Sequence, residues 1–302
     1  MFNAVLLGML YLDLGVLNRK SHAVSLKEAA WWSVAWIAVS LLFCGWITVS
    51  LGGQKGLEFL TGYLIEKSLS VDNLFVFIMV FAYFNVGPSD QPRVLKWGIL
   101  GALVMRFVLI LAGVALLAWF HWMFYLFGAV LIVTGIRMAA EQEQHVRPDR
   151  NPVLRLFKRV VPVATTDVPP HKFFVKRNAI WHATPLFVTV LMVEVSDLLF
   201  AVDSIPAVLA VSRDPLIVYT SNAFAILGLR ALYFLLSGIM GMFRYLKIGV
   251  SIVLMYVGIK MLLTDVYHIP VAVSLGVIVG VLTMAVIASL LPPKCPPDRP
   301  AS

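Results

Sequence analysis

The sequence predicts an all-α polytopic membrane protein with about nine transmembrane helices, and three observations support this class. Of its 302 residues, 60% are hydrophobic and 13% are charged, whereas a soluble domain has about 45–50% apolar and about 25% charged residues. The mean hydropathy is +0.89. The apolar residues gather in runs of the length that crosses a bilayer as a helix. A soluble globule could not bury this much apolar surface, and a disordered chain would contain far less of it.

The expected spans are nine apolar runs at residues 2–17, 30–50, 57–84, 97–119, 122–140, 183–211, 216–240, 245–264 and 269–291. The first run contains Asp13 and lacks both the basic start and the small-residue cleavage site of a signal peptide, so we expect it to be a span. The long polar segment 141–180 is rich in proline and is typical of a linker. Within it, residues 153–161 form either a short amphipathic helix on the lipid headgroups or part of a plain tether.

Basic residues predict the orientation of these spans. With the N-terminus outside, 18 of the 24 Lys and Arg residues fall in cytoplasmic loops, and the outer loops hold only Lys55 and Arg213. Cytoplasmic loops carry the excess of basic residues in membrane proteins. We therefore expect an outer N-terminus and a cytoplasmic C-terminus. This distribution accounts for the net charge of +8 without a nucleic-acid partner. The expected partners are the bilayer and a metal cation, and the 141–180 loop offers a surface for other membrane proteins.

Three markers recur in the same order in two parts of the chain. An acidic residue stands six positions before a Val-Asp aspartate, a Leu-Gly pair precedes an arginine, and a Gly-Ile pair precedes a basic residue and methionine. The matched residues are Glu66 and Asp197, Asp72 and Asp203, Arg106 and Arg230, and Gly135 and Gly258. Each copy holds three spans, so the second copy is inserted upside down. Inverted repeats are typical of secondary transporters, whose site lies at the repeat interface near the middle of the membrane.

The repeat defines the expected organisation of the chain. In this organisation the chain comprises a two-helix element (1–56), the first three-helix repeat (57–140), a basic cytoplasmic linker (141–180), the second, inverted repeat (181–264), and a ninth helix with a Pro-rich cytoplasmic tail (265–302).

Six carboxylates fall within the spans, where each costs about 2.5–3.5 kcal/mol on the insertion scale and indicates function by default. Only three or four basic residues oppose them, and we expect Arg106 and Arg230 to be charge partners. A divalent cation or protons would balance the remaining negative charge. The expected metal ligands are Asp72, Asp203, Glu66, Asp197 and Glu194, supported by Asn73, Ser204, Arg106, Arg230 and Asp13. For Glu194 and Asp13, a structural ion pair is an equally good interpretation.

The spacing of the carboxylates adds a constraint. Residues six apart lie about 120° apart around a continuous helix and about 9 Å apart along it, so they cannot hold one ion together. Either the helices open between these residues or the two carboxylates face different neighbours. We expect both helices to open locally, the second one at Pro206, so that freed carbonyls, Asn73 and Ser204 supply neutral oxygens. Such oxygen ligands favour Mn²⁺, Mg²⁺ or Ca²⁺. The cation is the transported substrate, and no permanently bound cofactor is expected.

The motifs themselves resemble those of the TerC family of integral membrane proteins. The similarity is concentrated in residues 66–77 and 194–207, and it also includes residues 13–20, 97–106 and 120–122. It covers nearly the whole chain except the linker and the tail. The resemblance implies efflux of Mn²⁺ by the acidic positions named above. We accordingly expect a non-enzymatic, multi-pass protein of the bacterial cytoplasmic (inner) membrane.

Two functions from other classes stay open. Asp72 and Asp203 could share a proton as the dyad of an intramembrane aspartyl-type enzyme, although the sequence contains no Gly-x-Gly-Asp motif. The chain could also be a non-transporting subunit of a membrane stress-response complex that docks through its 141–180 loop. Metal flux without peptide cleavage in proteoliposomes would separate transport from the enzyme, and a pull-down through the loop would test the third function.

Overall fold

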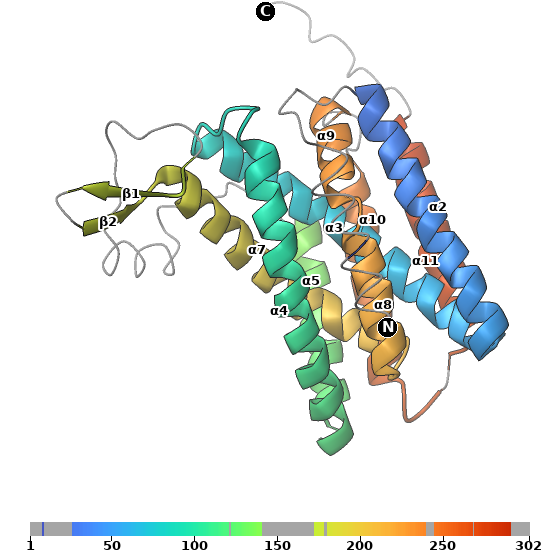
Figure 1. Ribbon diagram of the computed structural model, residues 1–302. Coiled ribbons are helices and arrows are strands. Elements are labelled where there is room, and N and C mark those ends of the chain that lie inside the picture. Colours follow the sequence, from blue (N-terminus) through green and yellow to red (C-terminus); the bar gives the residue numbers. More distant parts are fainter. Residues whose placement is uncertain are drawn as a thin grey trace, which may run out of the picture.

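A computed structural model describes residues 26–120, 122–140, 172–177, 180–239, 245–267 and 269–290, together with Gly8. Within them the chain forms helices joined by short turns, and one β-hairpin (Figure 1). The helices are α2 (Leu26–Leu51), α3 (Gly53–Tyr83), α4 (Gln91–Trp119), α5 (Met123–Ala140), α7 (Pro185–Leu209), α8 (Pro215–Ile226), α9 (Leu229–Ile239), α10 (Leu246–Leu262) and α11 (Val271–Leu290). The expected span 2–17 with Asp13, and the 153–161 segment, lie outside the described residues.

Eight of the nine expected spans fall within the described residues, and each coincides with a helix or, in one case, with two helices. By length and composition, α2, α4, α5, α7 and α11 can each cross a membrane, and α8 with α9 makes a sixth crossing if the bent pair is one span. In the described part of the chain, α10 is shorter, with 17 residues, and α3 carries charges along its length. The 31 residues of α3 extend about 46 Å, which exceeds the bilayer core of about 30 Å. The chain is thus a helical polytopic membrane protein.

The broken helix lies elsewhere than the sequence predicts. The expectation that the carboxylate-bearing helices open is wrong, because α3 is continuous and α7 continues through Pro206 to Leu209. Pro206 lies in the last turn of α7, and the helix continues past it although proline lacks the backbone N–H that would donate to the carbonyl of Val202. The break occurs between α8 and α9, which are bent by 43°. Gly228 adopts a φ of 78° there, a conformation that glycine tolerates at little cost.

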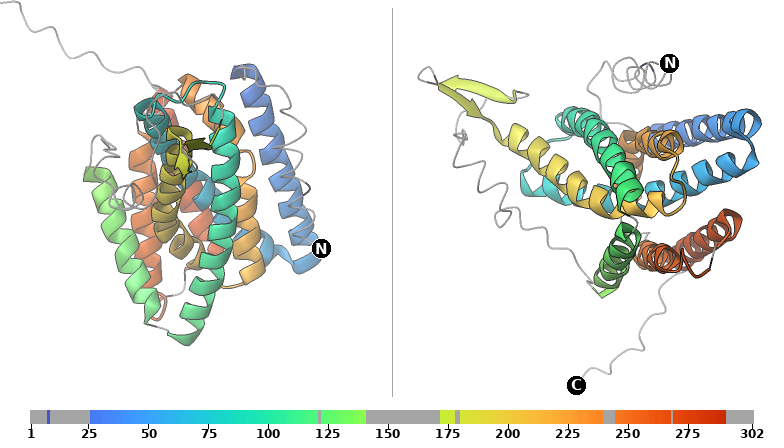
Figure 2. Two further views of the ribbon diagram at one scale, coloured as in Figure 1. Left: turned by 60° about the vertical axis from the view of Figure 1, so that its left-hand side comes forward. Right: turned by 90° about the horizontal axis from the view of Figure 1, so that it is seen from below.

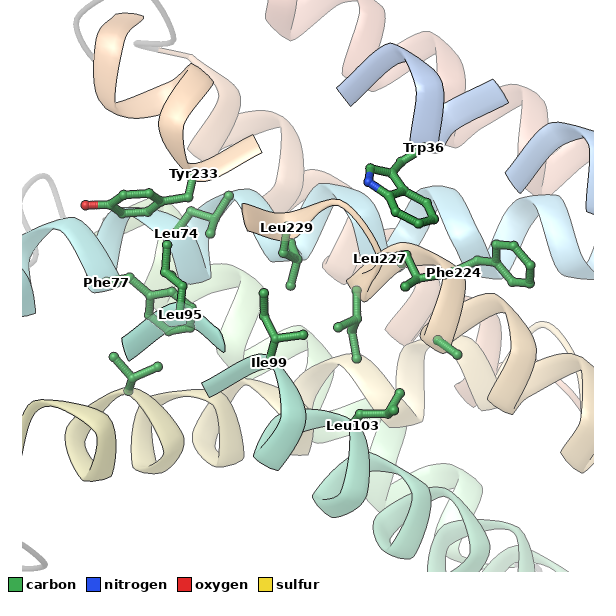
Figure 3. Packing of buried hydrophobic residues seen from close by; sticks show 14 of the residues in the cluster. Trp36, Leu74, Phe77, Leu95, Ile99, Leu103, Phe224, Leu227, Leu229 and Tyr233 are labelled. Atoms are coloured by element: carbon green, nitrogen blue, oxygen red, sulfur yellow. The ribbon is translucent and has the colours of Figure 1, made fainter. Parts of the chain in front are cut away.

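Helices of the two expected repeats pack against each other. Helix α3 contacts α7 and α8, α4 contacts α7, and α5 lies along α10. Figure 3 shows part of the buried cluster that joins α2, α3, α4, α7, α8 and α9, with Trp36 of α2, Phe77 of α3, Ile99 of α4 and Phe224 of α8. These interhelical contacts bring residues from both halves of the chain around one interior.

A β-hairpin precedes α7, where the sequence predicts only linker. Strand β1 (Phe174–Arg177) pairs antiparallel with β2 (Ile180–Ala183), and the hairpin projects from the helical body (Figure 2). Thr184 connects it to α7: its hydroxyl donates to the carbonyl of Lys172 over 2.7 Å and accepts from the amide of Phe187 over 3.3 Å. This N-cap, followed by Pro185, is a strong helix start. The hairpin is therefore attached firmly to the first turn of α7.

Candidate functional site

The candidate site is centred on Arg106 of α4, which is 1% exposed. Its guanidinium donates to both carboxylate oxygens of Asp197 of α7, from Nε over 3.2 Å and from Nη2 over 3.0 Å. The same guanidinium forms an ion pair with Glu66 of α3 through Nη1. A planar guanidinium is suited to such two-point contact with a carboxylate. Arg106 therefore links the equivalent acidic residues of the two expected repeats.

Amide and hydroxyl groups complete the cluster around Arg106. Its Nη1 donates to Oδ1 of Asn222 in α8 over 3.0 Å and to the hydroxyl of Ser204 over 3.4 Å. Nδ2 of Asn73 donates to Oδ1 of Asp197 over 3.3 Å. Residues seven apart lie on one face of a helix. Continuous helices thus present Glu66 with Asn73, and Asp197 with Ser204, toward the same interior.

Some oxygens of this cluster lack hydrogen bonds. Oε2 of Glu66, which is fully buried, and Oδ1 of Asn73 have no hydrogen-bond partner among the described residues, whereas Oε1 of Glu66 contacts Nη1 of Arg106. The ion pair with Arg106 gives Glu66 its counter-charge. Glu66, Asp197 and Arg106 together carry one net negative charge when all three are ionised. Unsatisfied buried oxygens in a negatively charged cluster are suited to accept a proton or a hard cation.

Asp203 points to a different neighbour. Its Oδ1 accepts from the hydroxyl of Thr134 in α5 over 2.9 Å. Asp203 follows Asp197 by six positions on the unbroken α7, and this spacing turns the two carboxylates toward different helices. The corresponding residue of the first repeat, Asp72, lies in α3, but its side chain is outside what the structure describes.

Glu194 is separate from the Arg106 cluster. Its carboxylate lies at an apolar cavity between α4, α7 and the start of β1. Gly101 of α4 allows this approach, because a Cβ atom there would collide with the carboxylate. Glu194 therefore shares a helix with Asp197 and Asp203 but faces neither of their partners.

Two further basic residues lie near the broken helix, the half-buried Lys67 and the buried Arg230. Nζ of Lys67 donates to the carbonyl oxygens of Ala225 and Leu227, over 3.2 and 3.5 Å, where α8 ends. A cation at this position stabilises the terminal carbonyls and the negative end of the helix dipole. Arg230 is buried in the first turn of α9. Arg106 lies in the middle of α4, whereas Arg230, its match in the expected repeat, lies just after the break between α8 and α9.

The expected metal ligands whose side chains the structure describes, Glu66, Asp197, Asp203 and Glu194, do not form one group. Within the described ranges, no three His, Cys, Asp or Glu side chains come close enough to hold a metal ion. The structure brings together Glu66 and Asp197, with Asn73, Ser204 and Arg106 around them. Sequence reasoning missed Asn222 and Thr134 as members of polar contacts. The sequence feature that could have identified Asn222 and Thr134 is a polar side chain within an apolar span.

Comparison with known proteins agrees with this membrane fold. The family model described as "Integral membrane protein TerC family" matches residues 51–294. An uncharacterized membrane protein of Myxococcus xanthus is 47% identical over 300 residues, which are 99% of this chain and 94% of the relative. The protein of Escherichia coli K12 named "Putative membrane-bound redox modulator Alx" is 48% identical over 295 residues, with 95% and 92% covered. A membrane protein of Rickettsia bellii is 36% identical over 96% of both chains. No solved structure matches.

Proposed function

The chain belongs to the TerC family of integral membrane proteins, and from this premise we propose that it transports a divalent metal cation, specifically Mn²⁺, out of the cytoplasm. The observation that carries the proposal is the pair of buried carboxylates, Glu66 and Asp197, that face each other across Arg106 from two continuous helices. A charged side chain buried inside a membrane protein costs free energy, and such residues mark ion pathways and proton relays.

The chemistry of the cluster favours a hard cation as the substrate. The donors are the carboxylates of Glu66 and Asp197 and the free amide oxygen of Asn73. Carboxylate and amide oxygens are the ligands of Mg²⁺, Ca²⁺ and Mn²⁺, whereas softer metals prefer sulfur or imidazole. We propose that the ion binds between Glu66 and Asp197, with Asp72 and Asp203 as further carboxylates along its path.

Arg106 supplies the counter-charge when the site holds no ion. A divalent cation that binds Glu66 and Asp197 must compete with the guanidinium, because both require the same carboxylate oxygens. Arg106 keeps contacts with Asn222 and Ser204, which can hold the guanidinium while a metal ion occupies the carboxylates. Arg106 is thus the cation that pairs with the carboxylates in the empty site, and the transported ion takes this role in the loaded site. The net charge of the interior stays small with and without the ion.

The packing pattern supports a site at the interface of two inverted repeats. Helix α3 contacts α8, and their equivalents in the other repeat, α7 and α4, also contact each other. In addition, each of the helices α3 and α5 contacts its own equivalent, α7 and α10 respectively. An approximate two-fold relation between the repeats would produce this pattern. Alternating access then follows from rocking of one repeat against the other around the fixed site.

Metal flux in proteoliposomes tests the proposal. We expect wild-type protein to move Mn²⁺ across the vesicle membrane, as monitored by an Mn²⁺-quenched dye, and we expect Asp197→Asn, Asp203→Asn and Asp72→Asn to abolish the flux. The control is Asp265→Asn, because Asp265 is exposed and accepts a hydrogen bond from the hydroxyl of Tyr125. Absence of flux in the wild type, or wild-type flux in Asp197→Asn, would contradict the proposal.

A further inference from the structure

The apolar cavity beside Glu194 lies between α4, α7 and β1, apart from the Arg106 cluster. Its volume is about 640 Å³, within the range of about 300–1,000 Å³ for pockets that hold drug-sized molecules. Trp97, Val104, Phe174 and Phe187 are among its apolar walls. The rings of Phe174 and Phe187 contact each other, with centroids 4.4 Å apart, so the hairpin and α7 form one continuous wall.

Among the described residues that line this apolar cavity, one carries a charge. The Glu194 carboxylate reaches it over Gly101, and it has no hydrogen bond or ion pair with any described residue. A carboxylate in such surroundings is costly unless it is neutralised or paired. Gly101 leaves the space that the carboxylate occupies, since any larger side chain would displace it. The architecture therefore directs one acidic group into an apolar cavity.

The lining determines the chemical class of ligand. A hydrated metal ion needs several oxygen ligands, and among the lining residues that the structure describes the carboxylate of Glu194 is the only charged oxygen group. A neutral apolar molecule would leave the carboxylate buried without a partner. An anion would be repelled. A cation with an apolar body pairs with the carboxylate, buries its apolar surface, and places its charge against aromatic faces such as that of Trp97.

We infer that this cavity binds a hydrophobic organic cation, with Glu194 as its counter-ion. The cavity lies near the N-terminal ends of α4 and α7, which is the cytoplasmic side in the proposed orientation. This function is additional to metal transport and uses a site outside the Arg106 cluster.

The test uses the full chain in lipid nanodiscs and tetraphenylphosphonium as the probe. Equilibrium dialysis of the radiolabelled probe, with empty nanodiscs subtracted, should show saturable binding. Glu194→Gln should weaken this binding at least about tenfold, because close charge pairs couple by that much or more. Asp265→Asn, which removes a carboxylate from the opposite end of the bundle, should leave the dissociation constant unchanged. The neutral analogue triphenylphosphine oxide should bind wild type and Glu194→Gln alike.

A second variant keeps the test decisive if Glu194→Gln does not fold, as judged by its elution profile and melting temperature. Val104→Trp fills the cavity while Glu194 stays in place, and it should abolish binding of both probes. The inference is overturned if wild-type binding does not exceed that of empty nanodiscs. It is equally overturned if Glu194→Gln, or Val104→Trp, binds tetraphenylphosphonium as tightly as the wild type.

Discussion

Arg106 is the residue on which the electrostatics of the interior depend. It is 1% exposed and contacts Glu66, Asp197, Asn222 and Ser204 from three neighbouring helices. The desolvation of a buried ion pair offsets much of its attraction, so the pair need not add stability. Removal of one partner is different, because it leaves the other charge buried without compensation. Arg106 is thus both a structural requirement and a competitor of the proposed substrate.

We predict that Arg106→Gln lowers the free energy of unfolding by about 3–5 kcal/mol, the usual loss when one partner of a buried pair is removed. Combining it with Asp197→Asn should cost less than the sum of the two single variants, because the double variant removes both charges. Denaturant titration of purified protein, followed by tryptophan fluorescence, measures both quantities. Strict additivity of the two losses would show that Arg106 and Asp197 do not depend on each other.

Close helix packing is the corresponding feature at the scale of elements. Helices α5 and α10 approach at Gly128 and Gly258, where a Cβ on Gly258 would lie 2.7 Å from the carbonyl oxygen of Gly128. Small residues allow membrane helices to pack backbone against backbone, and van der Waals contact is the main attraction between them. Helix α5 also contacts α7, where Thr134 of α5 donates a hydrogen bond to Asp203 of α7. The position of α5 therefore matters both for the glycine contact with α10 and for the hydrogen bond to Asp203.

Gly258→Leu should force α5 and α10 apart and destabilise the protein by about 1–3 kcal/mol or more. The matched control is Gly280→Leu in α11, where a Cβ meets no atom within 4 Å. Size-exclusion profiles after heating report the temperature at which half of each variant stays monodisperse. Equal temperatures for the two variants would argue against tight backbone packing at Gly258.

The break between α8 and α9 makes a separate prediction. Gly228 has a φ of 78°, and a Cβ there would also lie 2.8 Å from the side chain of Trp36. Gly228→Ala should therefore destabilise the protein by about 1–2 kcal/mol from backbone strain alone. Gly276→Ala in α11, where a Cβ meets open space, should be neutral or stabilising in the same heating assay. A neutral Gly228→Ala would mean that the break does not need a left-handed residue.

At the scale of the whole molecule, the distribution of basic residues predicts which side of the membrane each loop faces. The imbalance of basic residues predicts a cytoplasmic hairpin and an outer turn between α10 and α11. Lys176 on the hairpin and Val266 in that turn are both exposed. In a background with Cys44 and Cys295 replaced by serine, Lys176→Cys should resist a membrane-impermeant thiol reagent in intact cells, and Val266→Cys should react. The opposite result would reverse the orientation of every span.

The sequence by itself determined the membrane class, the helices within the described ranges and the acidic positions, because these depend on local length, hydropathy and charge. For example, the apolar run 30–50 forms α2 (Leu26–Leu51), as its composition predicts. Pro206 was misleading, since its effect depends on its position within the helix, which local sequence specifies poorly.

Only the tertiary structure decided which acidic residues meet. Glu66 and Asp197 share Arg106, Asp203 turns to Thr134, and Glu194 faces an apolar cavity. These partners come from helices that are distant in sequence, and each contact depends on which face of one helix packs against which face of another. Spacing along a single helix specifies the direction of a side chain relative to its own helix axis, but the neighbour in that direction is a property of the packed bundle.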